Sequence, residues 1–238
     1  FRSLSRLGYK PGMINTLGIK IGDENIETGF HVTTPSSQEI KEALLKMQEE
    51  KCTHVVLECT SQGLFMGRLA GIKFDIAVFT NIKSDHLGYH KSWGRYLYSK
   101  SLLIRENLKE GGTVILNSDD EKTLEYLKDL SPNSLLYSIR SEVDVYASDI
   151  KESFEGLSFS FGKHTMNIPI LGGYNISNAL ASVASLEPRG IEKEKSMLVL
   201  DDFPTVDGRM NILQRKPFTV IVDFAHTPQG LRESLTAL

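Results

Sequence analysis

The chain has 238 residues and a formal net charge of −3, and its 27 basic and 30 acidic side chains are interspersed. This balance leaves no stripe of positive potential for a nucleic-acid backbone, so nucleic acid is not an expected partner. No apolar run is long enough to span a bilayer, and residues 1–10 carry charges where a signal peptide has an apolar core, so we expect a cytoplasmic protein without membrane contact.

Apolar segments rich in β-branched residues alternate with amphipathic segments, which is typical of an α/β fold with a mostly parallel sheet flanked by helices. Residues 3–7 read as the end of a helix that runs into Gly8. Ser36 and Glu39 form a capping box, which predicts a helix over residues 36–51. The next predicted elements are buried strands over residues 53–59 and 74–82, a helix over residues 92–108 that stops at Gly111 and Gly112, and a strand over residues 113–117.

Shorter alternating segments follow and predict a small antiparallel subdomain beside the parallel sheet. They cover residues 143–150, 156–161 and 165–170. The remaining predicted elements are a helix over residues 175–186, a linker near Pro188 and Gly190, strands over residues 210–214 and 219–224, and a helix from Pro228 to the end of the chain.

The two cysteines, Cys52 and Cys59, flank the predicted strand over residues 53–59. Along an extended segment they are too far apart for easy pairing. We therefore expect two reduced thiols.

A polar loop over residues 80–90 follows the second buried strand, and Glu58 ends the first. Ligands of open α/β sheets bind off the carboxyl ends of strands, and a carboxylate there needs a partner such as a hard cation. Two other interpretations stay open: Glu58 is an ion-paired strand-end acid, and His86 is a helix cap. A zinc site has less support than a site for a hard cation, since His86 and His90 share one helical face but no third ligand is evident.

Lys100 shares a helical face with Trp93, Tyr96, Leu103 and Ile104. Most lysines in such a place extend to solvent. If the amine instead faces the sheet edge near Glu58 and His86, burial would favour its neutral, nucleophilic form. Such an amine can take up carbon dioxide and become a carbamate that ligates magnesium.

Six segments together closely resemble the Mur ligases, and within them the MurE group, which adds the third amino acid to the muramyl peptide. The resemblance covers nearly the whole chain and implies the central ATP-binding domain of that family. The segments cover residues 33–35, 58–68, 80–100, 173–180, 208–210 and 223–228.

The resemblance implies that Glu58, His86 and an N6-carboxylated Lys100 hold Mg²⁺ between ATP and a substrate carboxylate. The γ-phosphoryl group of ATP would pass to that carboxylate, and an amino group would then attack the acyl phosphate. The implied partners are a UDP-MurNAc-dipeptide and an amino acid, lysine or diaminopimelate, in peptidoglycan synthesis, and the protein would be a monomer.

The other family positions divide between the two large substrates. Those implied for the UDP-muramyl peptide are Thr33, Thr34, Thr60 and Arg68, and those implied for ATP are Asn175, Asn178, Arg209 and Asp223. Each set has a structural alternative: Thr33 or Thr34 could cap a helix, the asparagines could do the same, and Arg68 could be a solvated surface charge.

The family pattern is incomplete. Gln62, Met66 and Gly88 replace a histidine, a glutamine and an aspartate. The Gly-rich phosphate-binding loop is absent and by analogy would precede Phe1. We expect residues 1–228 to be a central domain without that loop and residues 229–238 to begin a further domain, so that the chain alone would not catalyse ligation.

Two other functions remain open. Folylpolyglutamate synthetases (FPGS) share the domain, although Tyr89-His90 and Thr33-Thr34-Pro35 favour the wall ligases. The chain could also be a non-catalytic module that binds a nucleotide-sugar peptide. Which amino acid would be added cannot be read from this sequence.

Overall fold

The computed structural model describes residues 1–26, 32–82, 87–201, 206 and 208–238. The chain divides into two compact units. One comprises Phe1–Ala77, Ile82–Val114 and Tyr126–Asn133, and the other Val78–Asn81, Ile115–Glu125 and Ser134–Leu238. Each unit is described by itself.

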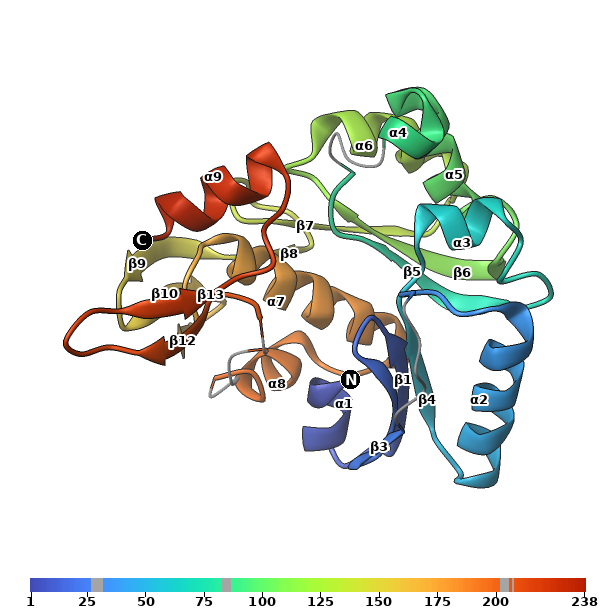
Figure 1. The fold of residues 1–238 in the computed structure, drawn as a ribbon, viewed down its shortest axis with the longest axis horizontal. Helices are drawn as coiled ribbons and strands as arrows, with labels where there is room; N and C mark the ends of the chain where they lie inside the picture. Colours follow the sequence, from blue (N-terminus) through green and yellow to red (C-terminus); the bar gives the residue numbers. More distant parts are fainter. Residues whose placement is uncertain (27–31, 83–86, 202–205, 207) are drawn as a thin grey trace. The chain divides into compact units, whose positions relative to one another are not determined.

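The first half of the chain begins with a helix and three consecutive strands, and helices are interleaved with strands after that (Figure 1). In order they are α1 (Arg2–Arg6), β1 (Pro11–Asn15), β2 (Gly18–Ile21), β3 (Glu24–Ile26), α2 (Ser37–Glu49), β4 (His54–Leu57), α3 (Ser61–Phe65), β5 (Phe74–Phe79), α4 (Leu87–His90), α5 (Trp93–Arg105) and β6 (Leu108–Asn117).

The second half contains more antiparallel structure. Its elements are α6 (Glu121–Leu127), η1 (Lys128–Leu130), β7 (Ser134–Ser138), β8 (Val145–Tyr146), β9 (Ser148–Ser153), β10 (Gly156–Phe161), β11 (His164–Ile168), α7 (Tyr174–Leu186), η2 (Glu187–Arg189), α8 (Lys193–Leu198), β12 (Asn211–Gln214), β13 (Val220–Val222) and α9 (Pro228–Thr236).

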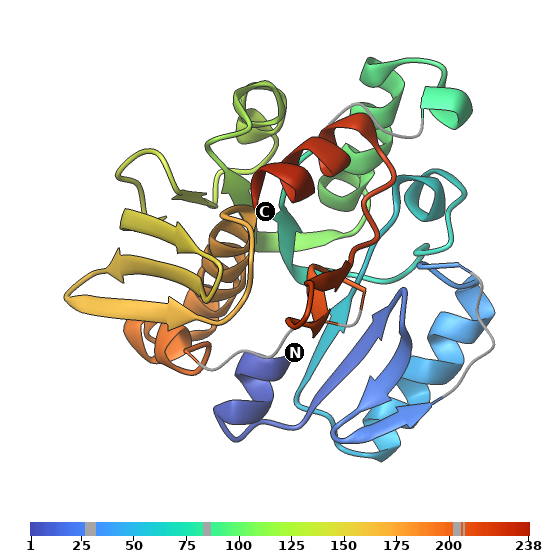
Figure 2. The same ribbon diagram turned by 60° about the vertical axis from the view of Figure 1, so that its left-hand side comes forward.

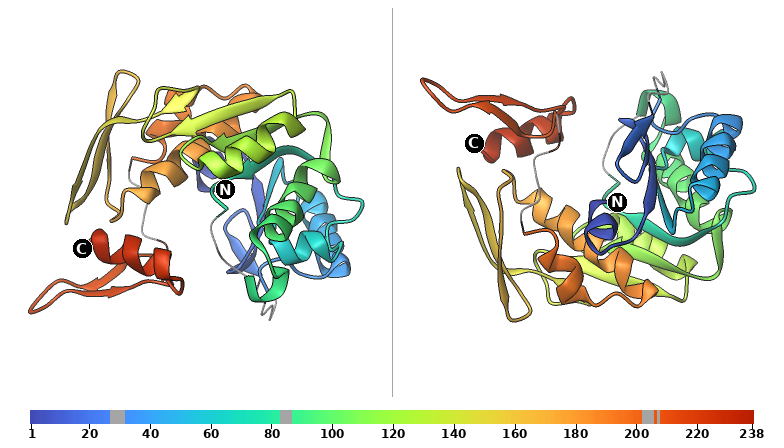
Figure 3. Two further views of the ribbon diagram at one scale, coloured as in Figure 1. Left: turned by 90° about the horizontal axis from the view of Figure 1, so that it is seen from above. Right: turned by 90° about the horizontal axis from the view of Figure 1, so that it is seen from below.

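The strands form a mixed α/β architecture. One sheet has the order β3-β2-β1-β4, in which β1 and β4 are parallel, and another has the order β5-β6-β7-β8, in which β7 and β8 are parallel. Strands β9, β10 and β11 form an antiparallel sheet, and β12 pairs with β13 in a hairpin that precedes α9 (Figure 3). The predicted class, a parallel sheet flanked by helices with a small antiparallel part, is confirmed.

Helix α2 packs on the sheet that contains β1. Its predicted capping box is present: Glu39 N–H donates to the Ser36 hydroxyl, and Ser36 N–H donates to the Glu39 carboxylate. Met47 of this helix covers Gly12 of β1 so closely that a Cβ at Gly12 would overlap the thioether sulfur. Ile14 of β1 and Ile40 of α2 are fully buried, and each contributes roughly 1.5–3 kcal/mol by leaving water.

In the second unit, α7 packs against β7, β8 and α8 (Figure 2). The fully buried Tyr137 of β7 donates its hydroxyl to the carbonyls of Phe79 and Thr80, both at 3.1 Å. Asn117 also donates to the Thr80 carbonyl, at 2.8 Å. These bonds fix the carboxyl end of β5, where the polar loop begins.

The end of α5 differs from the prediction. The helix ends at Arg105, and Gly111 and Gly112 lie inside β6 instead of stopping a helix. The reason is Asn107, whose side-chain amide donates to the carbonyls of Leu69 and Ile72 and turns the chain into the strand before the glycines are reached.

Two other sequence predictions are corrected. Strand β4 is not buried: Val55 and Val56 are 40% and 39% exposed, because β4 is an outer strand of its sheet. The segment 143–150 is not one antiparallel strand, since β8 pairs in parallel with β7 and only β9 joins the antiparallel sheet.

No helix in the described part of the chain is both long enough and apolar enough to cross a membrane. Cys52 and Cys59 are free thiols, as expected.

Candidate functional site

Glu58 follows β4 and is held by the turn that follows β1. Its exposed carboxylate accepts two hydrogen bonds on Oε2 from Thr16, from the backbone N–H at 3.2 Å and from the hydroxyl at 3.1 Å. Because β1 and β4 are parallel neighbours, their carboxyl ends meet at one edge of the sheet. Thr16 was missed in the sequence, although its place after an apolar strand is the signal that could have found it.

Three predicted substrate residues gather at the same edge. Thr34 is fully buried, and its hydroxyl donates to the Glu58 carbonyl at 3.0 Å and accepts from the N–H and hydroxyl of Thr60 at 2.9 and 3.0 Å. The hydroxyl of Thr33 lies 2.9 Å from that of Thr16. Thr34 therefore joins the loop before α2 to the end of β4, and the predicted substrate contacts of these threonines stay predictions.

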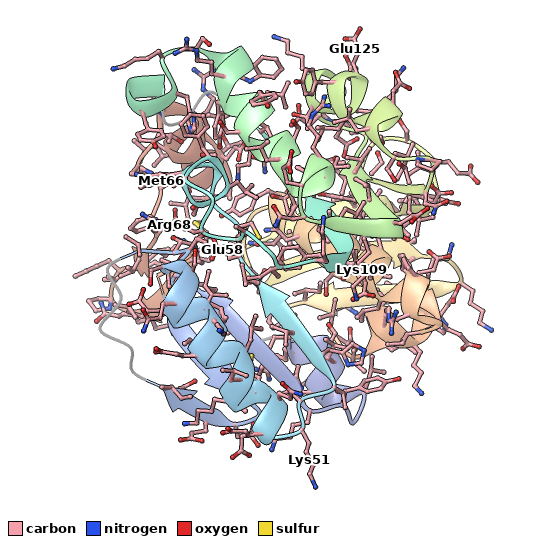
Figure 4. The ribbon with its side chains drawn as sticks, turned by 90° about the vertical axis from the view of Figure 1, so that its right-hand side faces the viewer. Lys51, Glu58, Met66, Arg68, Lys109 and Glu125 are labelled. Atoms are coloured by element: carbon pink, nitrogen blue, oxygen red, sulfur yellow. The ribbon has the colours of Figure 1, made fainter. Side chains whose placement is uncertain are left out.

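Arg68 lies just beyond α3, whose first turn is capped by the Thr60 hydroxyl, an acceptor for Gly63 N–H at 3.0 Å. One guanidinium nitrogen donates to the Thr34 carbonyl at 2.8 Å, and another lies 3.6 Å from the Met66 sulfur. Arg68, Met66 and Glu58 lie on the same side of the molecule, at the end of β4 away from Lys51 (Figure 4). A guanidinium fixed by one arm can present its other donors to a carboxylate or phosphate.

Two of the three predicted magnesium ligands influence the pKa of one half-buried thiol, that of Cys59. Burial raises the pKa of Cys59 to about 12, while the Lys100 ammonium opposes the rise and the Glu58 carboxylate adds to it. The Lys100 nitrogen also lies 5.9 Å from the centroid of the Tyr96 ring. Glu58 and Lys100 thus lie within electrostatic range of the same atom.

The third predicted ligand, His86, lies outside the described residues. No three His, Cys, Asp or Glu side chains gather as a metal site in the ranges that are described. This result does not test the predicted site, because His86 lies outside the described ranges and Lys100 is not one of these four residue types. Of the three predicted ligands, Glu58 alone is a His, Cys, Asp or Glu within the described ranges. An exposed carboxylate oxygen at a strand end is a suitable donor for Mg²⁺.

His90 is buried in a hydroxyl-lined position. Its Nε2 lies 2.9 Å from the Ser61 oxygen and its Nδ1 lies 3.4 Å from the Ser99 oxygen. Its ring centroid is 5.2 Å from that of Tyr96. His90 therefore links α4 to α3 and α5, which is a different role from the zinc ligand considered in the sequence. The partners are distant in the chain, so no local pattern could have found this role.

The predicted ATP residues lie in the second unit, at the start of α7 and around β13. Asn178 donates to the Asn175 side-chain oxygen at 3.1 Å, and Asn175 donates to the Leu171 carbonyl at 2.8 Å. The Glu152 carboxylate accepts from Gly173 N–H at 3.1 Å. An anion of the protein itself already caps this helix, which makes the α7 terminus unsuited to a phosphate.

Arg209 lies close enough to Asp223 for its charge to act on that carboxylate, and the role of both residues in ATP binding stays a prediction. The guanidinium carbon of Arg209 is 4.7 Å from the centroid of the Phe224 ring. Asp223 accepts from Met210 N–H and Ala225 N–H, both at 2.8 Å, and from the Ser234 hydroxyl at 3.0 Å.

The charge of Asp223 is stabilised by these bonds. Burial opposes ionisation, but the three hydrogen bonds and the Arg209 charge outweigh it and lower the pKa of Asp223. Burial, together with the Asp223 charge, also raises the pKa of Tyr174, which bonds Ser234. Tyr174 precedes Asn175 on α7, so it connects the asparagine pair to Asp223. Phe224 and Tyr174 are further candidate residues that the sequence did not single out.

Comparison with known proteins identifies the family. The Mur ligase middle domain model matches residues 3–186. The UDP-N-acetylmuramoyl-L-alanyl-D-glutamate--2,6-diaminopimelate ligase of Clostridium botulinum (strain ATCC 19397 / Type A) is 34% identical over 239 residues, which cover 98% of this chain and 48% of the relative. The corresponding L-lysine ligase of Staphylococcus aureus (strain MW2) is 33% identical over 242 residues, with the same shares of 98% and 48%.

A solved structure agrees with the sequence matches. A UDP-N-acetylmuramoyl-L-alanyl-D-glutamate--2,6-diaminopimelate ligase superposes with a TM-score of 0.82 and 27% identity, over 99% of this chain and 49% of that one. The chain spans about half the length of the curated relatives that it matches. Because the family model covers most of its residues, the chain belongs to the Mur ligase family.

Proposed function

We propose that the protein carrying this chain is an ATP-dependent ligase of peptidoglycan synthesis that joins an amino acid to UDP-MurNAc-L-Ala-D-Glu. The observation that carries the proposal is the geometry at the end of β4, where Thr16 holds the exposed Glu58 carboxylate and Arg68 donates to the Thr34 carbonyl. The names of the relatives, which are ligases for diaminopimelate or L-lysine, support the substrate class.

In this proposal the residues around Glu58 bind the metal and the muramyl peptide, and the residues around Asp223 bind the nucleotide. Glu58 and Lys100, with His86, would hold Mg²⁺, and Lys100 would do so as the carbamate formed when its amine adds carbon dioxide and releases a proton. The bound ion would neutralise negative charge as phosphate and carboxylate oxygens approach one another. Arg68 would orient an anionic group of the muramyl peptide, since one of its arms is already fixed on Thr34.

The nucleotide would be bound by Asp223, Asn175 and Asn178. Asp223 has three hydrogen bonds and about one lone pair left over, which suits a ribose hydroxyl. Asn175 and Asn178 lie at a helix start that Glu152 already caps, which favours the adenine over the phosphates as their ligand. The ATP-binding phosphate loop of the family is not among these residues.

The test is phosphate release by the full-length protein with ATP and Mg²⁺. We expect turnover only when UDP-MurNAc-L-Ala-D-Glu and a diamino acid are both present, and parallel assays with diaminopimelate and L-lysine identify the acceptor. Turnover that depends on folate and glutamate would overturn the proposal. Tight binding of the UDP-dipeptide without any turnover would favour a binding module instead.

A further inference from the structure

We infer that Thr16 is a positioning residue for Glu58, and that Thr33 holds Thr16 in place, so that a hydroxyl chain aims one carboxylate oxygen at the magnesium ion. This inference rests on the proposed function, because that function supplies the ion. Thr16 belongs to none of the segments that suggested the family.

The hydrogen bonds of Glu58 are unevenly distributed between its two oxygens. Oε2 accepts both bonds from Thr16, at 3.1 and 3.2 Å. In the described ranges of the chain, no hydrogen bond reaches Oε1. Two donors from one residue fix the rotation of the carboxylate, and the other oxygen then faces a cation in a defined direction.

The turn that carries Thr16 is itself rigid. Asn15 and Gly18 are the last paired residues of the β1–β2 hairpin, so that Thr16 and Leu17 form a two-residue connection. The Asn15 side chain accepts from Leu17 N–H at 3.0 Å, and Gly18 has a φ of 119°, which a residue with a side chain rarely adopts. Thr16 is therefore placed before any ligand arrives.

Counting protons fixes which hydroxyl is the donor in each of the hydrogen bonds that link Thr33, Thr16 and Glu58. A threonine hydroxyl has one proton, and the proton of Thr16 is used in the bond to Glu58. In the 2.9 Å contact between Thr33 and Thr16, Thr33 must therefore be the donor. Thr33 then offers only lone pairs to a ligand, so it would accept from an N–H or O–H group of the muramyl peptide.

The experiment measures metal binding by the full-length protein, with Mn²⁺ as a spectroscopic substitute for Mg²⁺. The free-Mn²⁺ signal in electron paramagnetic resonance gives the dissociation constant, and Mg²⁺ competition shows that both ions share the site. The variants are Thr16→Val, which keeps the shape but removes the hydroxyl, and Thr16→Ser, which retains the hydroxyl. Thr165→Val is the matched control at an exposed position of β11.

We expect Thr16→Val to weaken Mn²⁺ binding by roughly 10-fold, while Thr16→Ser stays within about twofold of the wild type. In a Glu58→Gln background, Thr16→Val should cause no further loss, because both changes act through the same carboxylate. Thermal unfolding of each variant checks that the chain remains folded.

Two results would overturn the inference: unchanged binding in Thr16→Val, or equal losses in Thr16→Ser and Thr16→Val. Failure of the proposed function looks different. If Glu58→Gln itself leaves Mn²⁺ binding intact, then Glu58 is not a ligand and the magnesium site is wrong. If Glu58→Gln weakens binding and Thr16→Val does not, the site stands and only the role of Thr16 is rejected.

Discussion

The Nε2 atom of His90 lies 2.9 Å from the hydroxyl oxygen of Ser61, which joins the last residue of α4 to the first residue of α3 across 29 positions of the sequence. Both side chains are buried, so water cannot replace either partner. The helix that precedes Arg68 and the helix that carries Lys100 are thus connected through one imidazole.

His90→Ala should lower the free energy of unfolding by about 3 kcal/mol, because it leaves a cavity and removes a hydrogen-bond partner from two buried hydroxyls. Urea unfolding measures the change. Tyr89→Ala is the control, since Tyr89 is adjacent but exposed. Equal losses in the two variants would contradict the proposed linking role of His90.

Ser36→Ala should destabilise the protein by about 1 kcal/mol, because Glu39 N–H loses its acceptor at the start of α2. Ser37→Ala, one position later and without a capping bond in α2, should change stability by less than about 0.5 kcal/mol. The measurement is the urea midpoint of each variant, and a larger effect at Ser37 would show that the cap is assigned to the wrong residue.

Cys59 should react with iodoacetamide much more slowly than Cys52 in the folded protein. Burial raises the pKa of both thiols, but that of Cys59 reaches about 12, so very little thiolate exists near neutral pH. When Lys100 carries no carboxyl group, Lys100→Met should slow Cys59 further, because the ammonium that lowers the pKa of the thiol is lost; a carboxylated Lys100 is an anion, and its removal should speed the reaction instead. Mass spectrometry of labelled peptides gives both rates, and unfolded protein, where the rates should converge, is the control. An unchanged Cys59 rate in Lys100→Met would show that no charge on Lys100, of either sign, acts on the thiol.

The stabilisation that Asp223 gives to the folded protein should decrease as the pH falls. Its pKa is lowered on folding, so the stabilisation is complete above the ordinary value of 3.8 and disappears as the pH falls through the lower, folded value. The stability difference between wild type and Asp223→Ala should therefore be constant from about pH 7 to pH 5 and shrink below about pH 4. Urea unfolding across this range tests it, and a difference that grows on acidification would reverse the sign of the shift.

Lys100→Ala should abolish ligase turnover in the full-length protein if the carboxylated amine is a magnesium ligand. Small added carboxylates should restore part of the activity, because they can supply the missing oxygen ligand. Lys91→Ala, at an exposed lysine that follows α4, is the matched control. Full activity in Lys100→Ala would remove the carbamate from the mechanism.

Local signals in the sequence determined several elements well. Ser36 and Glu39 start α2, and Pro228 lies in the first turn of α9, because such signals need only residues within the same turn. The prediction that the helix of residues 92–108 stops at Gly111 was wrong. Asn107 donates to the carbonyls of Leu69 and Ile72, and α5 ends before the glycines are reached. The hairpins of β1, β2 and β3 were not predicted at all.

The sequence by itself therefore determined the α/β class, the positions of many helices and strands and the family resemblance, since these depend on short-range patterns and on the order of motifs. Only the tertiary structure decided that Thr16 holds Glu58 across 42 positions and that Phe224 lies under Arg209. Such contacts join residues from different elements, and their geometry is fixed by strand pairing and helix packing, which no local pattern of side chains specifies.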